Sequence, residues 1–314
     1  MVKGIKKIRI TFWMYYITER EVEANFGMKM AIDAVNDAFK EYFNNTAGVD
    51  SRNRTISESS VLSTMPAYMN KYHITGFKTY VVTKEGARFV VLLFDSVSSE
   101  MIAVIEANRL GQVRTGAVTA LGTNILHGKC SVFSLIGSGF QAETQLEGIL
   151  EIGDPSLVKV YSRTPEHGKQ FVKKMEQKYR RDISFREDLR SVLEGADVIS
   201  CITSSKEPLI SDLSFLESYH LNIGGANVLS HREVSQNVMR SSDIVVVEHL
   251  EQALKESSEI SDFVNEGGKT VEFKDVVGES QKYKGNKKTI FKTMGIGLED
   301  IASAYHLLKN MDLL

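Results

Sequence analysis

The sequence predicts an α/β protein that joins a doubly wound parallel sheet to a second, α+β domain. Two observations support this prediction. From Ser131 onward, short apolar strands alternate with helical patterns, which is typical of a parallel sheet covered by helices. Before that point, several strands follow one another across short turns, which is typical of an antiparallel sheet. A chain of 314 residues is long enough for both domains.

The first part of the chain is predicted to form two helices and then several strands. Thr18-Glu19-Arg20-Glu21 has the spacing of a capping box, so a helix begins there. Apolar residues recur three and four apart over 29–43, which predicts an amphipathic helix. Strands follow at 64–68, 76–82 and 88–94. A turn at 83–86 makes the last two a hairpin, and 113–126 is predicted to be a helix that leads into the second domain.

The second part of the chain contains the strands of the predicted parallel sheet. They are expected at 132–136, 157–161, 183–185, 198–202, 221–223 and 244–247, with helical patterns between them. A last amphipathic helix at 298–308 lies outside this alternation, so we expect it to pack against the first domain. The predicted domains are therefore 1–126 together with 296–314, and 127–295.

Composition excludes several classes of protein. The formal net charge of −2 gives no basic surface for nucleic acid or for anionic membranes. No segment approaches the ~20 apolar residues of a membrane helix. Cys130 and Cys201 lack CxxC spacing, which predicts reduced core thiols and a cytoplasmic location. The seven histidines show no metal-ligand spacing, so no metal is predicted.

The N-terminus is basic over 1–10 and apolar over 12–17. This apolar part is too short for a signal peptide, and charged residues follow it where a cleavage site should lie. Either Met1 or Met14 could be the natural start.

A glycine-rich turn carries the first functional signal. The apolar run 132–136 stops at Gly137-Ser138-Gly139-Phe140-Gln141-Ala142, and a helical pattern follows. Strand, tight Gly-x-Gly-x-x-Ala turn and helix together are typical of a site for a dinucleotide pyrophosphate. The N–H groups of the helix N-terminus would face the anion. The motif therefore predicts that residues 137–141 bind NAD(P), although an ordinary strand–turn–helix corner would have the same pattern.

The end of the second strand indicates which dinucleotide is preferred. In such folds a carboxylate there binds the ribose of NAD, whereas an arginine accommodates the 2′-phosphate of NADP. Here the strand ends in Ser162-Arg163-Thr164, which offers a guanidinium and two hydroxyls but no carboxylate. We therefore predict a preference for NADP(H), with NAD(H) possible. Thr203 and Ser204 end the fourth strand and are expected near the nicotinamide ribose.

Several segments, in this order, resemble one family: the ornithine cyclodeaminases, the mu-crystallins and their archaeal alanine dehydrogenase relatives. The segments are Met65-Pro66-Ala67, Gly76-Phe77-Lys78, Arg114-Thr115-Gly116-Ala117-Val118, the glycine turn, Tyr161-Ser162-Arg163-Thr164, Asn222-Ile223-Gly224-Gly225 with Glu233, and Gly295-Ile296-Gly297-Leu298-Glu299-Asp300. The resemblance implies a Rossmann domain in the middle of the chain and a substrate-binding, homodimer-forming domain completed by the last helix. It also implies hydride transfer at a carbon that bears nitrogen, in a cleft between the domains.

The resemblance implies roles for individual residues. Lys78 would face the substrate and handle its carboxylate or its proton. Arg114 and Arg54 would bind the substrate carboxylate, and Arg52 is close enough to be an alternative to Arg54. Met65 would lie beside the substrate, whereas Thr115 and Gly295 would lie beside the cofactor.

Asn227 is a departure from the family pattern. Counting back from Glu233 places it where cyclodeaminases carry an acid/base aspartate. An amide hydrogen-bonds a substrate or cofactor but does not exchange protons usefully. This change argues against conversion of ornithine to proline.

Three functions follow as hypotheses. The first is an NADP(H)-dependent oxidoreductase that acts on a small amino acid, its keto acid or its imine. The second is ornithine cyclodeaminase. The third is a small-molecule binding protein gated by NADPH, with little turnover.

Overall fold

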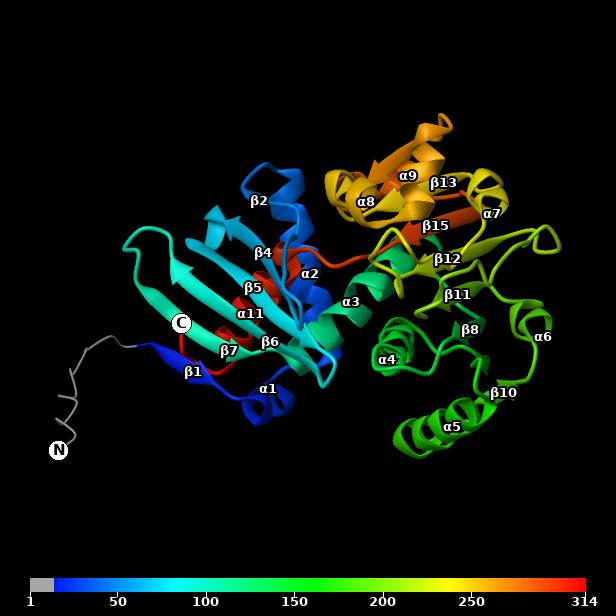
Figure 1. The fold of residues 1–314 in the computed structure, drawn as a ribbon, viewed down its shortest axis with the longest axis horizontal. Helices are drawn as coiled ribbons and strands as arrows, with labels where there is room; N and C mark the ends of the chain where they lie inside the picture. Colours follow the sequence, from blue (N-terminus) through cyan, green and yellow to red (C-terminus); the bar gives the residue numbers. More distant parts are fainter. Residues whose placement is uncertain (1–13) are drawn as a thin grey trace.

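The computed structural model describes residues 14–314 and contains two β-sheets (Figure 1). The choice between Met1 and Met14 as the natural start concerns residues 1–13, which lie outside the described part. The long helix α3 (Asn108–Leu126) runs between the two sheets and connects them in sequence (Figure 1).

The first sheet has seven strands in the order β1-β7-β6-β5-β4-β2, with β3 paired to β4. They are β1 (Tyr15–Ile17), β2 (Ala47–Val49), β3 (Asn53–Ile56), β4 (Val61–Met69), β5 (Ile74–Thr83), β6 (Gly86–Asp95) and β7 (Met101–Glu106). The predicted antiparallel hairpin of β5 and β6 is confirmed, with Thr83 paired to Gly86 at its turn. The sheet is not wholly antiparallel, because the edge strand β1 pairs parallel to β7.

Three helices accompany the first sheet. They are α1 (Glu19–Asn25), α2 (Met28–Phe43) and α11 (Gly297–Asn310). The capping box at Thr18 and Glu21 is confirmed at the start of α1. The last helix α11 packs on β4 and β5, as its apolar stripe predicted, because that stripe has no place in the second sheet.

The second sheet has eight strands, all parallel, in the order β10-β9-β8-β11-β12-β15-β13-β14. They are β8 (Val132–Ile136), β9 (Leu157–Tyr161), β10 (Ser184–Arg186), β11 (Val198–Cys201), β12 (Tyr219–Ile223), β13 (Ile244–Val247), β14 (Thr270–Glu272) and β15 (Lys288–Lys292). The order reverses between β8 and β11, and ligands bind at the carboxyl ends of strands at such a switch point.

Helices cover both faces of this second sheet, as the alternating pattern predicted. They are α4 (Ala142–Ile152), α5 (Pro165–Tyr179), α6 (Leu189–Leu193), α7 (Gln236–Arg240), α8 (Leu250–Glu256), α9 (Ser258–Asn265) and α10 (Phe273–Gly278). Apolar residues of α4 and α5 form one core with β8 and β9, whereas α6, α7 and α9 form another core.

The hydrophobic core of the first sheet extends beyond its own stretch of chain. It includes Phe273 of α10 and Phe291 of β15, which lie within the segment assigned to the second domain. The rings of these two residues also contact each other, with centroids 4.4 Å apart. The division of the chain at 126 and 296 therefore remains a prediction, because α10 and β15 contribute to the core of the first sheet although they belong to the segment of the second.

The two cysteines are free and buried, as predicted. Burial raises the pKa of the Cys130 thiol to about 12. Between residues 14 and 314, no helix is both long and apolar enough to cross a membrane. Over the same described residues, histidine, cysteine and carboxylate side chains nowhere gather in threes around a potential metal position.

Candidate active site

A cavity of about 530 Å³ lies between the first sheet and the loops that follow β12 and β15. Four cationic side chains line it: Arg52, Arg54, Lys78 and Arg114. Asn227, Thr115 and Gln141 lie on its other walls. The structure thus brings together residues that lie in five separate segments of the chain.

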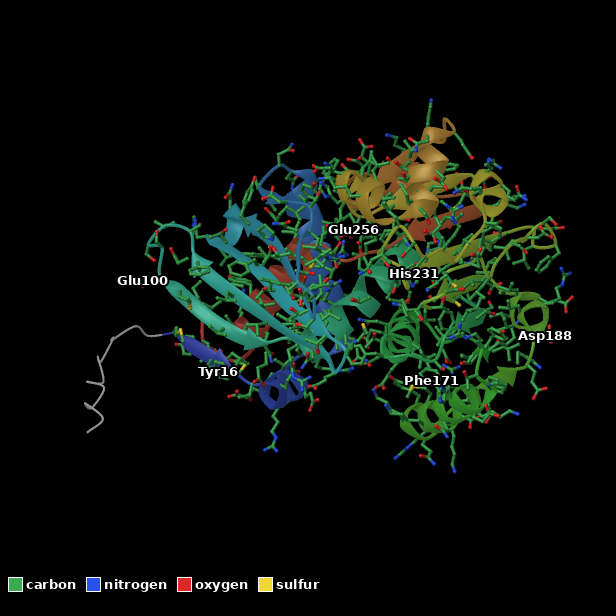
Figure 2. The ribbon with its side chains drawn as sticks, viewed as in Figure 1. Tyr16, Glu100, Phe171, Asp188, His231 and Glu256 are labelled. Carbon is green, nitrogen blue, oxygen red and sulfur yellow. The ribbon has the colours of Figure 1, made fainter. Side chains whose placement is uncertain are left out.

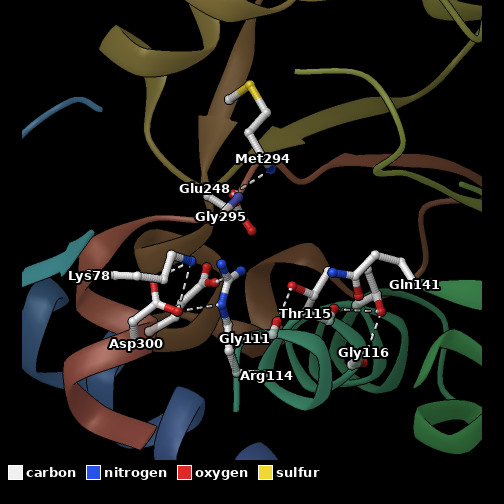
Figure 3. Close-up of polar contacts among 12 residues, drawn as sticks. Lys78, Gly111, Arg114, Thr115, Gly116, Gln141, Glu248, Met294, Gly295 and Asp300 are labelled. Atoms are coloured by element: carbon white, nitrogen blue, oxygen red, sulfur yellow. Dashed lines mark hydrogen bonds and ion pairs between the residues drawn. The ribbon is translucent and has the colours of Figure 1, made fainter. Parts of the chain in front are cut away.

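Lys78 lies on β5 with only 3% of its surface exposed. Its Nζ lies 2.9 Å from Oδ1 and 2.8 Å from Oδ2 of Asp300, at the start of α11 (Figure 3). Burial, together with the nearby charge of Arg114, lowers the pKa of Lys78 to about 8, although Asp300 opposes this shift. An ammonium with this pKa gives up and regains a proton near neutral pH.

Arg114 lies in the second turn of α3 and shares the same carboxylate. Its Nε donates to Asp300 Oδ1 at 2.9 Å, and its Nη1 donates to Glu299 Oε2 at 2.8 Å. Burial alone would lower the pKa of Arg114, but the carboxylates of Asp300 and Glu299 raise it overall, so the guanidinium stays charged. Asp300 therefore holds the ammonium and the guanidinium side by side (Figure 3), and both side chains line the cavity.

Glu299 and Glu248 form a second layer behind Arg114. Glu248 Oε2 accepts the backbone N–H groups of Met294 and Gly295, both at 2.7 Å. The Oε1 atoms of Glu248 and Glu299 are both buried, and no other residue of 14–314 donates a hydrogen bond to either atom. Burial, and then the proximity of Glu248, raises the pKa of Glu299 well above its ordinary value. The cationic side chains therefore line the cavity, whereas the carboxylates that pair with them lie behind its lining.

Arg52 and Arg54 share a fourth carboxylate, that of Glu256 on α8, and Glu256 lies between the two sheets (Figure 2). Arg52 is almost fully enclosed, and its Nη2 also donates to the carbonyl oxygens of Met294 (2.6 Å) and Gly295 (3.0 Å). Arg54 leaves 25% of its side chain exposed, compared with 3% for Arg52. Of the two, Arg54 is the more accessible to a ligand, and Arg52 chiefly joins the two halves of the chain.

The remaining residues expected beside the substrate differ in position. Asn227 lines the cavity, and its carbonyl oxygen accepts Arg54 Nη2 at 3.1 Å. Met65 is fully buried and does not line the cavity, although it shares a face of the sheet with its cross-strand partner Lys78, because α11 begins directly over it. Gly295, expected beside the cofactor, lines the Lys78 cavity. Its φ is +75°, and a Cβ there would lie 2.6 Å from Arg114 Nη1, so the position requires glycine.

A second cavity, of about 260 Å³, lies over the glycine turn at the switch point of the second sheet. Every residue from the predicted dinucleotide site that lines it is polar or glycine: Gly137, Ser138, Gly139, Ser162, Arg163, Thr164, Thr203 and Ser204. Phe140 and Gln141 do not line it. Phe140 is 61% exposed beside the turn, and Gln141 and Thr115 line the Lys78 cavity instead.

The glycine turn fits a dinucleotide. Gly137 has a φ of +117°, and a Cβ there would lie 2.5 Å from the carbonyl oxygen of Ile202. A Cβ on Gly139 would meet no atom within 4 Å, so the backbone at this position faces open space. The hydroxyls of Ser138 and Ser162 lie 2.9 Å apart beside it. Backbone N–H groups, hydroxyls and Arg163 together match the groups that bind phosphates.

One buried carboxylate connects the two cavities. Glu233 accepts the backbone N–H of Thr203 at 2.6 Å, its hydroxyl at 2.9 Å, and the N–H of Gly225 at 2.7 Å. Thr203 lines the glycine-turn cavity, and Gly225 lines the Lys78 cavity. The two cavities are therefore neighbours, held at a fixed spacing by Glu233.

No role was predicted for Asp300, Glu299 and Glu256, which pair with the cationic residues, or for Glu248, which accepts the backbone N–H groups behind them. Asp300 and Glu299 stand in the first turn of a helix, where acidic residues are common for reasons of the helix dipole alone. Only their complete burial distinguishes them, and burial is a property of the folded chain.

A family model and several known proteins match this chain. The model of the ornithine cyclodeaminase/mu-crystallin family matches residues 15–312. The ketimine reductase mu-crystallin of Mus musculus is 29% identical over 215 residues, which are 68% of this chain and 66% of the mouse protein. The chain therefore spans slightly less than two thirds of that relative.

Two solved structures resemble the whole chain. The Thermococcus litoralis Delta(1)-pyrroline-2-carboxylate reductase in complex with NADH and L-proline has a TM-score of 0.86 and 25% identity, covering 95% of this chain and 97% of that one. An archaeal alanine dehydrogenase dimer with bound NAD has a TM-score of 0.85 and 25% identity, with 95% of each chain covered. The family match, the two-sheet fold and the order of the site segments lead to one conclusion: this chain belongs to the ornithine cyclodeaminase/mu-crystallin family.

Proposed function

We propose that this protein is an NAD(P)-dependent oxidoreductase that acts at the C–N bond of a small amino acid or its imine. The observation that carries the proposal is the Lys78–Asp300–Arg114 cluster in a cavity adjacent to the glycine turn. Relatives that bear reductase and dehydrogenase names, for pyrroline-2-carboxylate, ketimines and alanine, support the same class of reaction.

Residues 137–139, Ser162, Arg163, Thr164, Thr203 and Ser204 would hold the dinucleotide. A nicotinamide bound there would supply or accept the hydride at the carbon of the C–N bond. We propose NADP(H) as the preferred form, because Arg163 lines this cavity and no carboxylate does so among the described residues. The solved relatives contain NADH and NAD, so use of NAD(H) is also expected.

The chain's own residues would bind the substrate and move one proton. Arg114 uses Nε and Nη1 within the protein, which leaves Nη2 for a substrate carboxylate. The cationic side chains that line the cavity favour such an anion. Lys78 would give a proton to the substrate nitrogen during reduction and take it back during oxidation. Asn227 would hydrogen-bond the substrate without exchanging protons.

We also propose a homodimer, formed through the outer face of the first sheet. Apolar side chains of β4, β5, β6 and β7 form cross-strand pairs on this face: Pro66 with Phe77, Phe77 with Leu92, and Leu92 with Val104. The helices α2 and α11 pack on the opposite face. The alanine dehydrogenase relative is a dimer.

The test is the oxidation of NADPH and of NADH, followed by absorbance, with 2-oxo acids plus ammonia and with cyclic imino acids. We expect turnover only of substrates that carry a carboxylate. We also expect NADPH to be preferred over NADH. Arg163→Gln should raise KM for NADPH about tenfold and leave KM for NADH nearly unchanged. Binding of NADPH without turnover of any of these substrates would contradict the proposed enzyme and favour a binding protein.

A further inference from the structure

We infer that the substrate carries an apolar side chain, aliphatic or aromatic, which lies along a wall formed by Tyr80, Phe89, Val82, Val61 and Ile56. This inference rests on the proposed function, because it takes the Lys78 and Arg114 end of the cavity as the site of the carboxylate and the reacting nitrogen. It assigns the opposite end of the same cavity to the substrate side chain.

The strand β5 sets the direction of this wall. Lys78, Tyr80 and Val82 alternate along β5 and therefore share one face of the sheet. Successive residues on one face of a strand are ~7 Å apart, so the wall begins one such step from Lys78 and extends to ~14 Å. The Lys78 Nζ lies 6.0 Å from the centroid of the Tyr80 ring, which agrees with this spacing.

Neighbouring strands extend the wall sideways. Phe89 is the cross-strand partner of Tyr80, and their rings stack with centroids 4.8 Å apart. Val61 is the partner of Val82, and Ile56 is the partner of Val61. All five residues line the cavity. Ile56 is 75% exposed and Val82 is 40% exposed, so apolar surface at this end remains open to a ligand.

The charges around the cavity exclude the other common side chains. Among the described residues, the cavity lining contains four cationic residues and neither Asp nor Glu. The ω-ammonium of ornithine or lysine would meet no free carboxylate in this lining, because Glu256 and Asp300 lie behind it and already pair with the arginines and Lys78. An acidic side chain could reach Arg54, but Glu256 Oε1 already pairs with that guanidinium at 2.5 Å. An apolar side chain needs no partner and gains from covering the wall.

The test compares substrates that differ only in their side chains. With NADPH and ammonia, kcat/KM for the 2-oxo acids of leucine and phenylalanine should exceed that for pyruvate and for 2-oxoglutarate by at least about tenfold. With NADP⁺, leucine should be oxidised far better than ornithine. Turnover that favours ornithine, 2-oxoglutarate or pyruvate would overturn the inference and leave the proposed function intact.

Calorimetric titration with leucine, alanine, glutamate and ornithine gives a readout that does not depend on turnover. Leucine should bind at least about tenfold more tightly than the other three, even if the proposed reaction is wrong. Equal affinities, or tighter binding of ornithine, would overturn the inference.

A charge placed on the wall should invert the preference. Val82→Glu should lower the affinity for leucine at least about tenfold and raise that for ornithine, because the new carboxylate pairs with the ω-ammonium. Val97→Glu makes the same change in the turn between β6 and β7, which does not line the cavity, and should leave both affinities unchanged. No difference between the two variants would contradict the assignment of this wall.

Discussion

At the scale of single residues, the pKa of Lys78 sets the pH dependence of the proposed reaction. Burial and Arg114 lower this pKa to about 8. Reduction of an imine needs the protonated ammonium, so kcat/KM should fall as pH rises through about 8. Oxidation needs the neutral amine, so its rate should rise over the same range. Lys78→Met should lose about 100-fold or more in both directions, measured by steady-state kinetics.

Asp300→Asn provides the control for this assignment. The Asp300 carboxylate raises the pKa of Lys78, so its removal should move both pH profiles to lower pH. A profile that kept its midpoint in Asp300→Asn would show that another group carries the proton.

At the scale of secondary-structure elements, a buried polar network joins β12, β15 and α3. His220 Nδ1 lies 2.7 Å from Thr289 Oγ1, and its Nε2 lies 3.1 Å from Asn222 Oδ1. Asn222 Nδ2 donates in turn to Thr123 Oγ1 at 3.0 Å. The amide oxygen can only accept, so the network assigns the ring proton to Nε2. His220 therefore contributes to stability as the neutral imidazole.

This network predicts a loss of stability in acid. Burial, and then the proximity of His127, lowers the pKa of His220 to about 3 in the folded state, compared with about 6.5 when unfolded. The unfolded chain binds the proton first, so the free energy of unfolding should fall as pH drops from about 6.5 towards about 3. Urea unfolding at a series of pH values measures this slope.

His220→Gln is the matched variant for this prediction. It should cost about 1–3 kcal/mol at pH 7, because it disturbs buried hydrogen bonds. Its free energy of unfolding should depend less on pH between about 6.5 and about 3. An unchanged slope would assign the acid sensitivity to other groups.

At the scale of the whole molecule, the apolar outer face of the first sheet predicts self-association. Phe77→Glu places a charge at the middle strand of this face and should convert a dimer to a monomer, because burying an unpaired carboxylate is costly. Light scattering coupled to gel filtration measures the mass directly. Leu254→Glu, on the partly exposed side of α8, should leave the mass unchanged.

The sequence by itself determined the parts of this protein that depend on local pattern. Alternating strands and helices, the capping box and the glycine turn are set within a few residues of one another, and the structure contains them at the expected positions. The inner strand β15 was not predicted. Lysines at both of its ends, Lys288 and Lys292, mask its apolar run, although Lys292 is fully buried and donates to the carbonyl of Ala226.

Only the tertiary structure decided how the candidate site is held together. Asp300 is 222 residues from Lys78 and 186 from Arg114 in sequence, yet it contacts both. Glu256 joins Arg52 and Arg54 across a similar separation. The complete burial of Met65 is likewise absent from the pattern of its motif. Burial and charge pairing depend on which distant segments the fold brings into contact. A local sequence pattern does not specify these contacts.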